Sequence, residues 1–206
     1  MLHDIKTCRA GLGSSLGWSK SLLWLACAVT CFHLAYASVK FSAAGFLIFG
    51  YVLGLVKLTA HPNVRRAFYL GLATGLLCYA PQLAFFCRIF NVAAVVLWLV
   101  VAFWVGLFVA LACGCRRRWG NGRAAWLIPV LWMGIEYFRS ELYYLKFSWL
   151  NIGYVFANWP VFPFLNCGMY AVGLLVFAVT CYFATGDLPK AQRMGYFCVF
   201  FFECCF

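Results

Sequence analysis

Six long apolar runs, separated by short polar segments, dominate this chain of 206 residues. The runs cover residues 21–37, 41–58, 67–87, 89–113, 124–138 and 164–185. Each approaches the roughly 20 residues that a helix needs to cross the hydrocarbon core of a bilayer. The pattern therefore predicts an all-α fold, a polytopic transmembrane helix bundle with about six spanning helices.

The composition indicates that lipid is the main solvent of this chain. Hydrophobic residues make up 66% of the sequence and charged residues 10%, whereas a soluble domain is about half apolar and about a quarter charged. So few polar side chains cannot cover a folded domain in water. An ordinary soluble domain is therefore excluded, and so is a disordered chain, because disorder requires low hydrophobicity.

The basic residues predict how the bundle is oriented. If the N-terminus is cytoplasmic, 12 of the 16 Lys and Arg residues fall in inside segments. The other 4 fall in outside segments, and they are Lys40, Arg88, Arg139 and Lys146. Cytoplasmic loops carry an excess of Lys and Arg, so a cytoplasmic N-terminus is predicted. These charges lie between apolar runs rather than on one exposed face, and no nucleic-acid partner is expected.

The chain divides into three segments. Residues 1–20 form a cytoplasmic N-terminal segment, residues 21–185 the transmembrane domain, and residues 186–206 a cytoplasmic loop with an apolar end. That end, residues 196–206, would reach about 16 Å as a helix, roughly half the hydrocarbon core. It predicts a truncated seventh helix, although a short interfacial tail fits it equally well. The run at 21–37 also has a signal-peptide interpretation, but another apolar run follows at once, which favours an uncleaved helix.

Glu136 is the acidic residue that stands out, because it lies inside the fifth apolar run. An ionisable group at the bilayer midplane costs about 2.5 kcal/mol or more. Arg139 follows three residues later and Trp132 precedes by four, so all three share one helix face. An arginine and a carboxylate can form a bidentate pair there. The pair either shapes the outer mouth of a substrate cavity or pins the helix end, and we favour the structural interpretation.

The remaining sequence offers few groups for chemistry. Neither a metal-binding motif nor a nucleophile with its base can be assembled, so we predict no catalytic residue, no metal and no cofactor. His33, alone in an apolar run, is typical of a hydrogen-bonded core residue. Most cysteines also lie in apolar runs, where a thiol behaves as a small hydrophobe. Gly71 and Gly75, four residues apart, predict a stripe for close helix packing.

Several segments, taken in order, carry a family resemblance. Residues 129–139 read PVLWMGIEYFR, residues 147–154 read FSWLNIGY, and residues 168–173 read GMYAVG. Together with residues 67–76 (AFYLGLATGL) they resemble the N-terminal membrane domain of bacterial apolipoprotein N-acyltransferases. The positions that match the motifs of that family are Trp132, Glu136, Arg139, Phe147, Trp149, Gly153, Tyr154, Gly168 and Tyr170.

The resemblance implies a role in lipoprotein biosynthesis at the bacterial inner membrane. The family transfers an acyl chain from a phospholipid to a cysteine thiol, and then to the N-terminal diacylglyceryl-cysteine of a lipoprotein. A nitrilase-like domain with a Glu, a Lys and a Cys performs this chemistry after the seventh helix. None of the twelve cysteines here matches that nucleophile.

We therefore expect a membrane domain that is not catalytic by itself, with its motif residues at the outer rim. Its expected partners are phospholipids, together with a lipoprotein substrate or a separate nitrilase-like domain. Two other functions stay open at this point. The first is a non-enzymatic scaffold for a separately encoded acyltransferase, and the second is an unrelated transporter-like bundle. A transporter needs a polar pathway through its helices, and intramembrane polar groups are few here.

Overall fold

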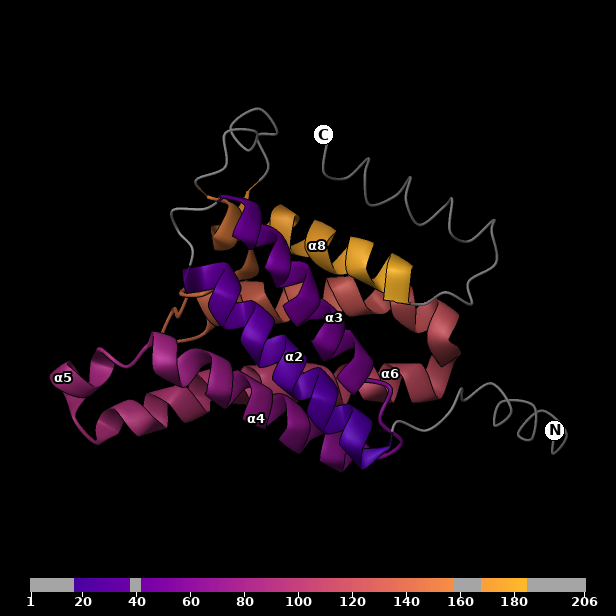
Figure 1. The fold of residues 1–206 in the computed structure, drawn as a ribbon, viewed down its shortest axis with the longest axis horizontal. Helices are drawn as coiled ribbons and strands as arrows, with labels where there is room; N and C mark the ends of the chain where they lie inside the picture. Colours follow the sequence, from indigo (N-terminus) through magenta and orange to yellow (C-terminus); the bar gives the residue numbers. More distant parts are fainter. Residues whose placement is uncertain (1–16, 38–41, 158–167, 185–206) are drawn as a thin grey trace, which may run out of the picture.

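The computed structural model describes residues 17–37, 42–157 and 168–184, and within these ranges every regular element is helical (Figure 1). The predicted all-α fold is therefore confirmed. The elements are α2 (Trp18–Ala37), η1 (Ser42–Leu47), α3 (Ile48–Leu58), α4 (Val64–Gln82), α5 (Phe86–Phe90), α6 (Ala93–Tyr137), η2 (Phe138–Leu142), η3 (Ile152–Phe156) and α8 (Met169–Ala184). The predicted seventh helix lies outside the described residues.

Helix α6 is two helices joined by a sharp bend at Gly120. This residue has φ 77° and ψ 171°, which interrupts the helical backbone. Glycine adopts a positive φ without a steric penalty, so it can turn the chain within one residue. The second arm then runs back along the first (Figure 1). The fourth and fifth apolar runs thus form separate arms, as predicted, but the basic loop expected between them is reduced to this bend.

Helix α4 packs closely against the first arm of α6 through glycines. A Cβ on Gly71 would lie 2.9 Å from the side chain of Val109, and one on Gly75 would lie 2.9 Å from the Cα of Ala102. On the facing arm, a Cβ on Gly106 would lie 3.1 Å from the backbone oxygen of Phe68. The predicted small-residue stripe at Gly71 and Gly75 is therefore confirmed, and it brings two backbones into direct contact.

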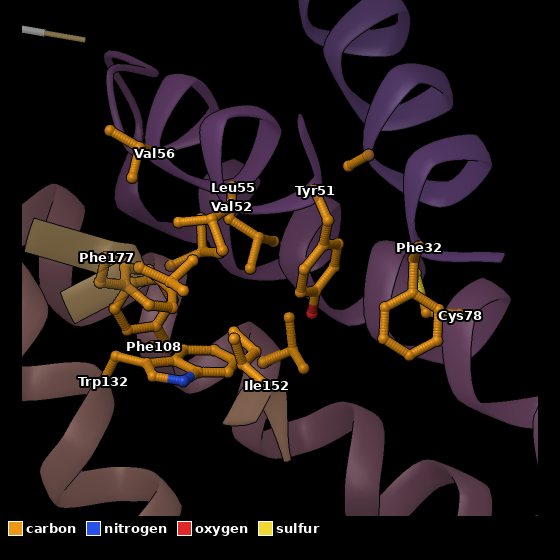
Figure 2. Packing of buried hydrophobic residues seen from close by; sticks show 14 of the residues in the cluster. Phe32, Tyr51, Val52, Leu55, Val56, Cys78, Phe108, Trp132, Ile152 and Phe177 are labelled. Atoms are coloured by element: carbon orange, nitrogen blue, oxygen red, sulfur yellow. The ribbon is translucent and has the colours of Figure 1, made fainter. Parts of the chain in front are cut away.

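Aromatic side chains fill the centre of the bundle (Figure 2). The rings of Trp132 and Phe177 are stacked with centroids 4.7 Å apart, and Phe108 meets Trp132 edge-on at 4.8 Å. These three rings come from α8 and from both arms of α6. Offset stacked and edge-on pairs are the preferred aromatic geometries, so this cluster holds the three helices together.

His33 of α2 is hydrogen-bonded, as the sequence predicted. The ring of half-buried His33 lies 3.0 Å from the carbonyl oxygen of Leu77 through Nε2 and 3.3 Å from the side-chain nitrogen of Gln82 through Nδ1. His33 is therefore a hydrogen-bonded link between α2 and α4, not an unpaired group on an apolar face.

One helical stretch of the described chain, Ala93–Leu142, is long and apolar enough to cross a membrane. The segments Ala44–Leu58 and Met169–Ala184 are shorter apolar helices. The helical bundle is thus established, whereas the count of six membrane spans and the orientation stay predictions.

Replacing Gly75 by alanine should destabilise the bundle, because the new methyl group would press on the backbone of the facing arm. Overpacking of this kind costs about 1–3 kcal/mol. Thermal unfolding of the detergent-purified protein should show a lowered Tm. The matched control is Gly134→Ala, because a Cβ on Gly134 meets nothing within 4 Å. Equal Tm values for the two variants would contradict close packing at Gly75.

Candidate functional site

The candidate site lies where the second arm of α6 ends and α8 begins. The α-helix gives way there to one π-helical turn, η2, in which Arg139 and Ser140 are buried. Single π turns are rare and often occur at functional sites. A loop follows η2 and returns through η3 to the start of α8. We call the buried polar group formed by Glu136, Arg139, Ser140 and Asn151 the Asn151 clamp.

Glu136 anchors the loop from inside the bundle. Its side chain is 2% exposed, and its Oε1 accepts a hydrogen bond of 3.0 Å from the backbone N–H of Ile152. Its Oε2 lies against Gly173 of α8, where a Cβ would be 3.0 Å away. A residue larger than glycine at position 173 would therefore press on the carboxylate. A hydrogen bond from a backbone N–H to a carboxylate is charge-assisted and strong.

Arg139 binds the same loop from the next turn. Its Nη2 donates to Oδ1 of Asn151 and, at 3.5 Å, to the carbonyl oxygen of Trp149. Within the described part of the chain no direct hydrogen bond or ion pair joins Arg139 to Glu136. The bidentate pair that the sequence suggested is therefore wrong in detail. Both charges are buried on one side of the helix, but each one holds the loop rather than the other.

Asn151 is the centre of the site, and sequence reasoning did not single it out. Its side chain is fully buried, and its Nδ2 donates to Oγ of Ser140 at 3.1 Å and contacts Sδ of Met169 at 3.6 Å. Its carbonyl oxygen accepts a hydrogen bond of 3.0 Å from the hydroxyl of Tyr36. Elements α2, η2 and α8 thus converge on one residue. The feature of the sequence that could have indicated Asn151 is its polar amide side chain between two apolar residues, Leu150 and Ile152.

Gly153 has a steric role that explains the glycine of the motif. A Cβ at this position would fall onto the carbonyl oxygen of Met169 and would lie 2.9 Å from the Met169 Cα. The obstacle is backbone, so it cannot rotate away as a side chain could. Only glycine lets η3 pack directly against the start of α8.

The aromatic motif residues gather on the other side of the loop, against α5. Trp149 stacks on Phe86 and Phe85 at centroid distances of 5.0 and 5.4 Å, and Phe147 lies 5.6 Å from Trp149. Trp149 remains 44% exposed. This cluster therefore packs the loop against α5 while Trp149 stays partly exposed at the surface.

The other three motif residues are Tyr154, Gly168 and Tyr170. Tyr154 is 44% exposed, and a Cβ on Gly168 would meet nothing within 4 Å. The hydroxyl of Tyr170 donates to Oε1 of Glu141 at 2.7 Å, in an exposed hydrogen bond. The structure thus brings Glu136 and Arg139 together with the loop, with Trp132 on the same helix. Tyr154, Gly168 and Tyr170 are not part of the buried clamp.

The groups of the clamp can position the loop. Its charged and amide groups are used as hydrogen-bond anchors, and its glycine allows a close backbone contact. No group of three or more His, Cys, Asp or Glu side chains within residues 17–37, 42–157 and 168–184 could hold a metal ion. The arrangement holds one aromatic loop against one end of the helical bundle.

Fold and site together define an all-helical domain that presents an ordered aromatic loop. Residues 28–182 match the family described as the apolipoprotein N-acyltransferase N-terminal domain. The chain belongs to this family, as the sequence motifs predicted.

A curated relative gives the extent of the likeness. The apolipoprotein N-acyltransferase of Geobacter metallireducens is 29% identical over 124 residues, which cover 54% of this chain and 23% of the relative. The match thus spans less than a quarter of the length of that protein. No solved structure matches this chain.

Replacing Gly153 by alanine should loosen the loop from α8, because the methyl group and the Met169 backbone cannot occupy the same space. Trypsin cleavage at Lys146, the exposed lysine of the loop, should become faster, and the Tm should fall. Gly168→Ala is the matched control, since its methyl group would enter open space. An unchanged cleavage rate in Gly153→Ala would rule out the steric role assigned to this glycine.

Proposed function

We propose that this chain is the membrane-embedded domain of an apolipoprotein N-acyltransferase-like protein. In this role it binds phospholipid and holds the clamped aromatic loop at its outer rim. The observation that carries the proposal is the Asn151 clamp. Three helical elements bind one loop through buried polar groups, at the positions where the sequence carries the family's motifs.

Exposed apolar side chains support embedding in a bilayer. The first arm of α6 exposes a series of large hydrophobic residues along its length, among them Val96, Leu99, Phe103 and Leu111. Contiguous apolar surface of this kind marks a contact with lipid or with another protein. We assign it to the acyl chains of the bacterial inner membrane, because the stretch that contains it is also long enough to span one.

The distribution of charge supports the proposed orientation. Neighbouring helices are antiparallel, because their contacts run in opposite directions along the chain. The contacts are Gly50–Cys31 and Gly54–Ala28, Gly71–Val109 and Gly75–Ala102, and Trp132–Phe177 and Glu136–Gly173. Most described basic residues therefore gather at the end opposite the clamp. They are Lys20, Lys57, Arg65, Arg66, Arg116, Arg117, Arg118 and Arg123. We place this end in the cytoplasm and the clamp outside.

The proposed division of labour follows from the chemistry of the clamp. Its groups position a loop, and acyl transfer from phospholipid to lipoprotein is assigned to a nitrilase-like region carrying Glu, Lys and Cys. The alternative is a non-enzymatic scaffold for a separately encoded acyltransferase. The intact mass of the protein isolated from its native membrane distinguishes a catalytic region on the same polypeptide from a separate partner.

Membranes that contain this protein should add an acyl chain to a synthetic diacylglyceryl-cysteine peptide, with phospholipid as the donor. Mass spectrometry of the peptide measures the product. Depletion of the protein should abolish the product, and re-expression should restore it. Asn151→Ala should restore less per folded protein, because the clamp loop loses its anchor, whereas Gly134→Ala should restore it fully. Acylation that persists after depletion would reject the proposed function.

The orientation predicts a one-sided protease pattern. Trypsin added to the outside of spheroplasts should cut after exposed Lys146 and should spare exposed Arg117 and Arg118. Inverted membrane vesicles should give the reverse pattern, because the bilayer then shields the clamp loop. Fragments identified by mass provide the measurement. Cleavage at Arg117 in intact spheroplasts would refute a cytoplasmic location for the bend of α6.

A further inference from the structure

An open groove runs along the first arm of α6 and ends at the clamp loop. It has a volume of about 420 Å³. Its lining is apolar and aromatic, and consists of Val96, Leu99, Val100, Phe103, Trp104 and Tyr143. Ligand pockets commonly have volumes of about 300–1,000 Å³ and mostly hydrophobic walls. The groove is therefore a candidate binding site, separate from the buried polar groups of the clamp.

The shape of the groove suits an elongated apolar ligand. Four of its lining residues, at positions 96, 99, 100 and 103, are spaced three and four apart and share one face of α6. This face extends for roughly 10 Å along the helix axis. Val96, Leu99 and Phe103 are exposed in the chain by itself. They belong to the stretch that is long and apolar enough to span a membrane, so acyl chains are the surroundings that match it.

The clamp loop builds one end of the groove. The ring of Trp104 meets Tyr143 edge-on with centroids 5.4 Å apart, and it lies 5.6 Å from the ring of Phe138 in η2. The backbone N–H of Tyr143 donates to the carbonyl oxygen of Phe138 at 2.7 Å. The π turn that buries Arg139 therefore also positions the aromatic end of the groove.

A positive charge follows directly after this aromatic end. The backbone N–H of Lys146 donates to the carbonyl oxygen of Tyr143 at 2.9 Å, and the Lys146 side chain is exposed. In the described part of the chain no acidic side chain forms an ion pair with Lys146. Glu141, the acidic residue of the preceding turn, accepts a hydrogen bond from Tyr170 instead. An exposed cation beside an apolar groove is complementary to a lipid phosphate next to its acyl chain.

We infer that the groove binds one acyl chain of a phospholipid and that Lys146 binds the phosphate of the same molecule. The charge selects between two lipid sources. A diacylglyceryl group, as on a lipoprotein, carries acyl chains but no phosphate, so it would fill the groove without engaging Lys146. The groove is thereby assigned to the acyl donor rather than to the acceptor. This inference rests on the proposed function, because it requires the first arm of α6 to face lipid.

The test uses the full chain in vesicles of phosphatidylethanolamine and phosphatidylglycerol that also contain a minor share of diacylglycerol. The photoreactive residue p-benzoyl-phenylalanine replaces either Phe103 in the groove or Leu111 outside it. Both positions lie on the same arm and are 43% exposed, so Leu111 is the matched control. After irradiation, mass spectrometry measures the ratio of phospholipid adducts to diacylglycerol adducts at each position.

We expect a higher ratio at position 103 than at position 111. In Lys146→Gln the ratio at position 103 should fall about fivefold, the effect of removing one cation near a headgroup. Arg118→Gln removes an exposed cation at the opposite end of the bundle and should leave the ratio unchanged. Both adducts come from one sample, so a poorly folding variant changes the yield rather than the ratio.

The outcomes separate this site from the proposed function. Equal ratios at positions 103 and 111 would show general lipid contact, which overturns the groove but leaves the membrane embedding intact. A ratio that does not change in Lys146→Gln overturns the assignment to the phospholipid donor. Lipid adducts at neither position would overturn the embedding itself. If the label at position 103 prevents folding, Leu99, which also lines the groove and is exposed, takes its place.

Discussion

Asn151 connects three elements of this molecule, η2, α2 and α8, through polar contacts at one buried residue. An amide donates and accepts at once, so it can bind the Arg139 guanidinium through its oxygen and the Ser140 hydroxyl through its nitrogen. Its backbone carbonyl adds Tyr36 of α2. Inside an apolar bundle no bulk water replaces a lost hydrogen bond, so losing any of these bonds costs free energy of folding. The position of the loop therefore depends on this residue.

Close packing of backbones provides the frame on which the clamp rests. At Gly71 and Gly75, α4 approaches the first arm of α6 without intervening side chains, and at Gly153 the loop approaches α8 in the same way. Glycine contacts of this type position helices closely and leave little room for sliding. The polar clamp and the Gly153 contact thus both constrain the loop, whereas Gly71 and Gly75 fix α4 against α6.

The sequence motifs predicted which residues share the site, but not how they interact. Glu136 and Arg139 were expected on one helix face, and both are buried on that side of the helix. A direct pair between them was expected because the spacing rule assumes a regular α-helix. Arg139 instead lies in the π turn of η2, and its guanidinium reaches Asn151. No local sequence pattern predicted the π turn, and the partners of Arg139 within it lie ten and twelve residues further along the chain.

The sequence by itself determined the all-helical fold, the glycine stripe of α4 and the family to which the chain belongs. These features depend on periodicity, residue size and local order along the chain, which are visible in one dimension. Only the tertiary structure decided that Gly120 folds α6 back on itself and that Asn151 rather than the Glu136–Arg139 pair is the centre of the site. Such outcomes depend on contacts between residues far apart in the chain, which local sequence does not encode.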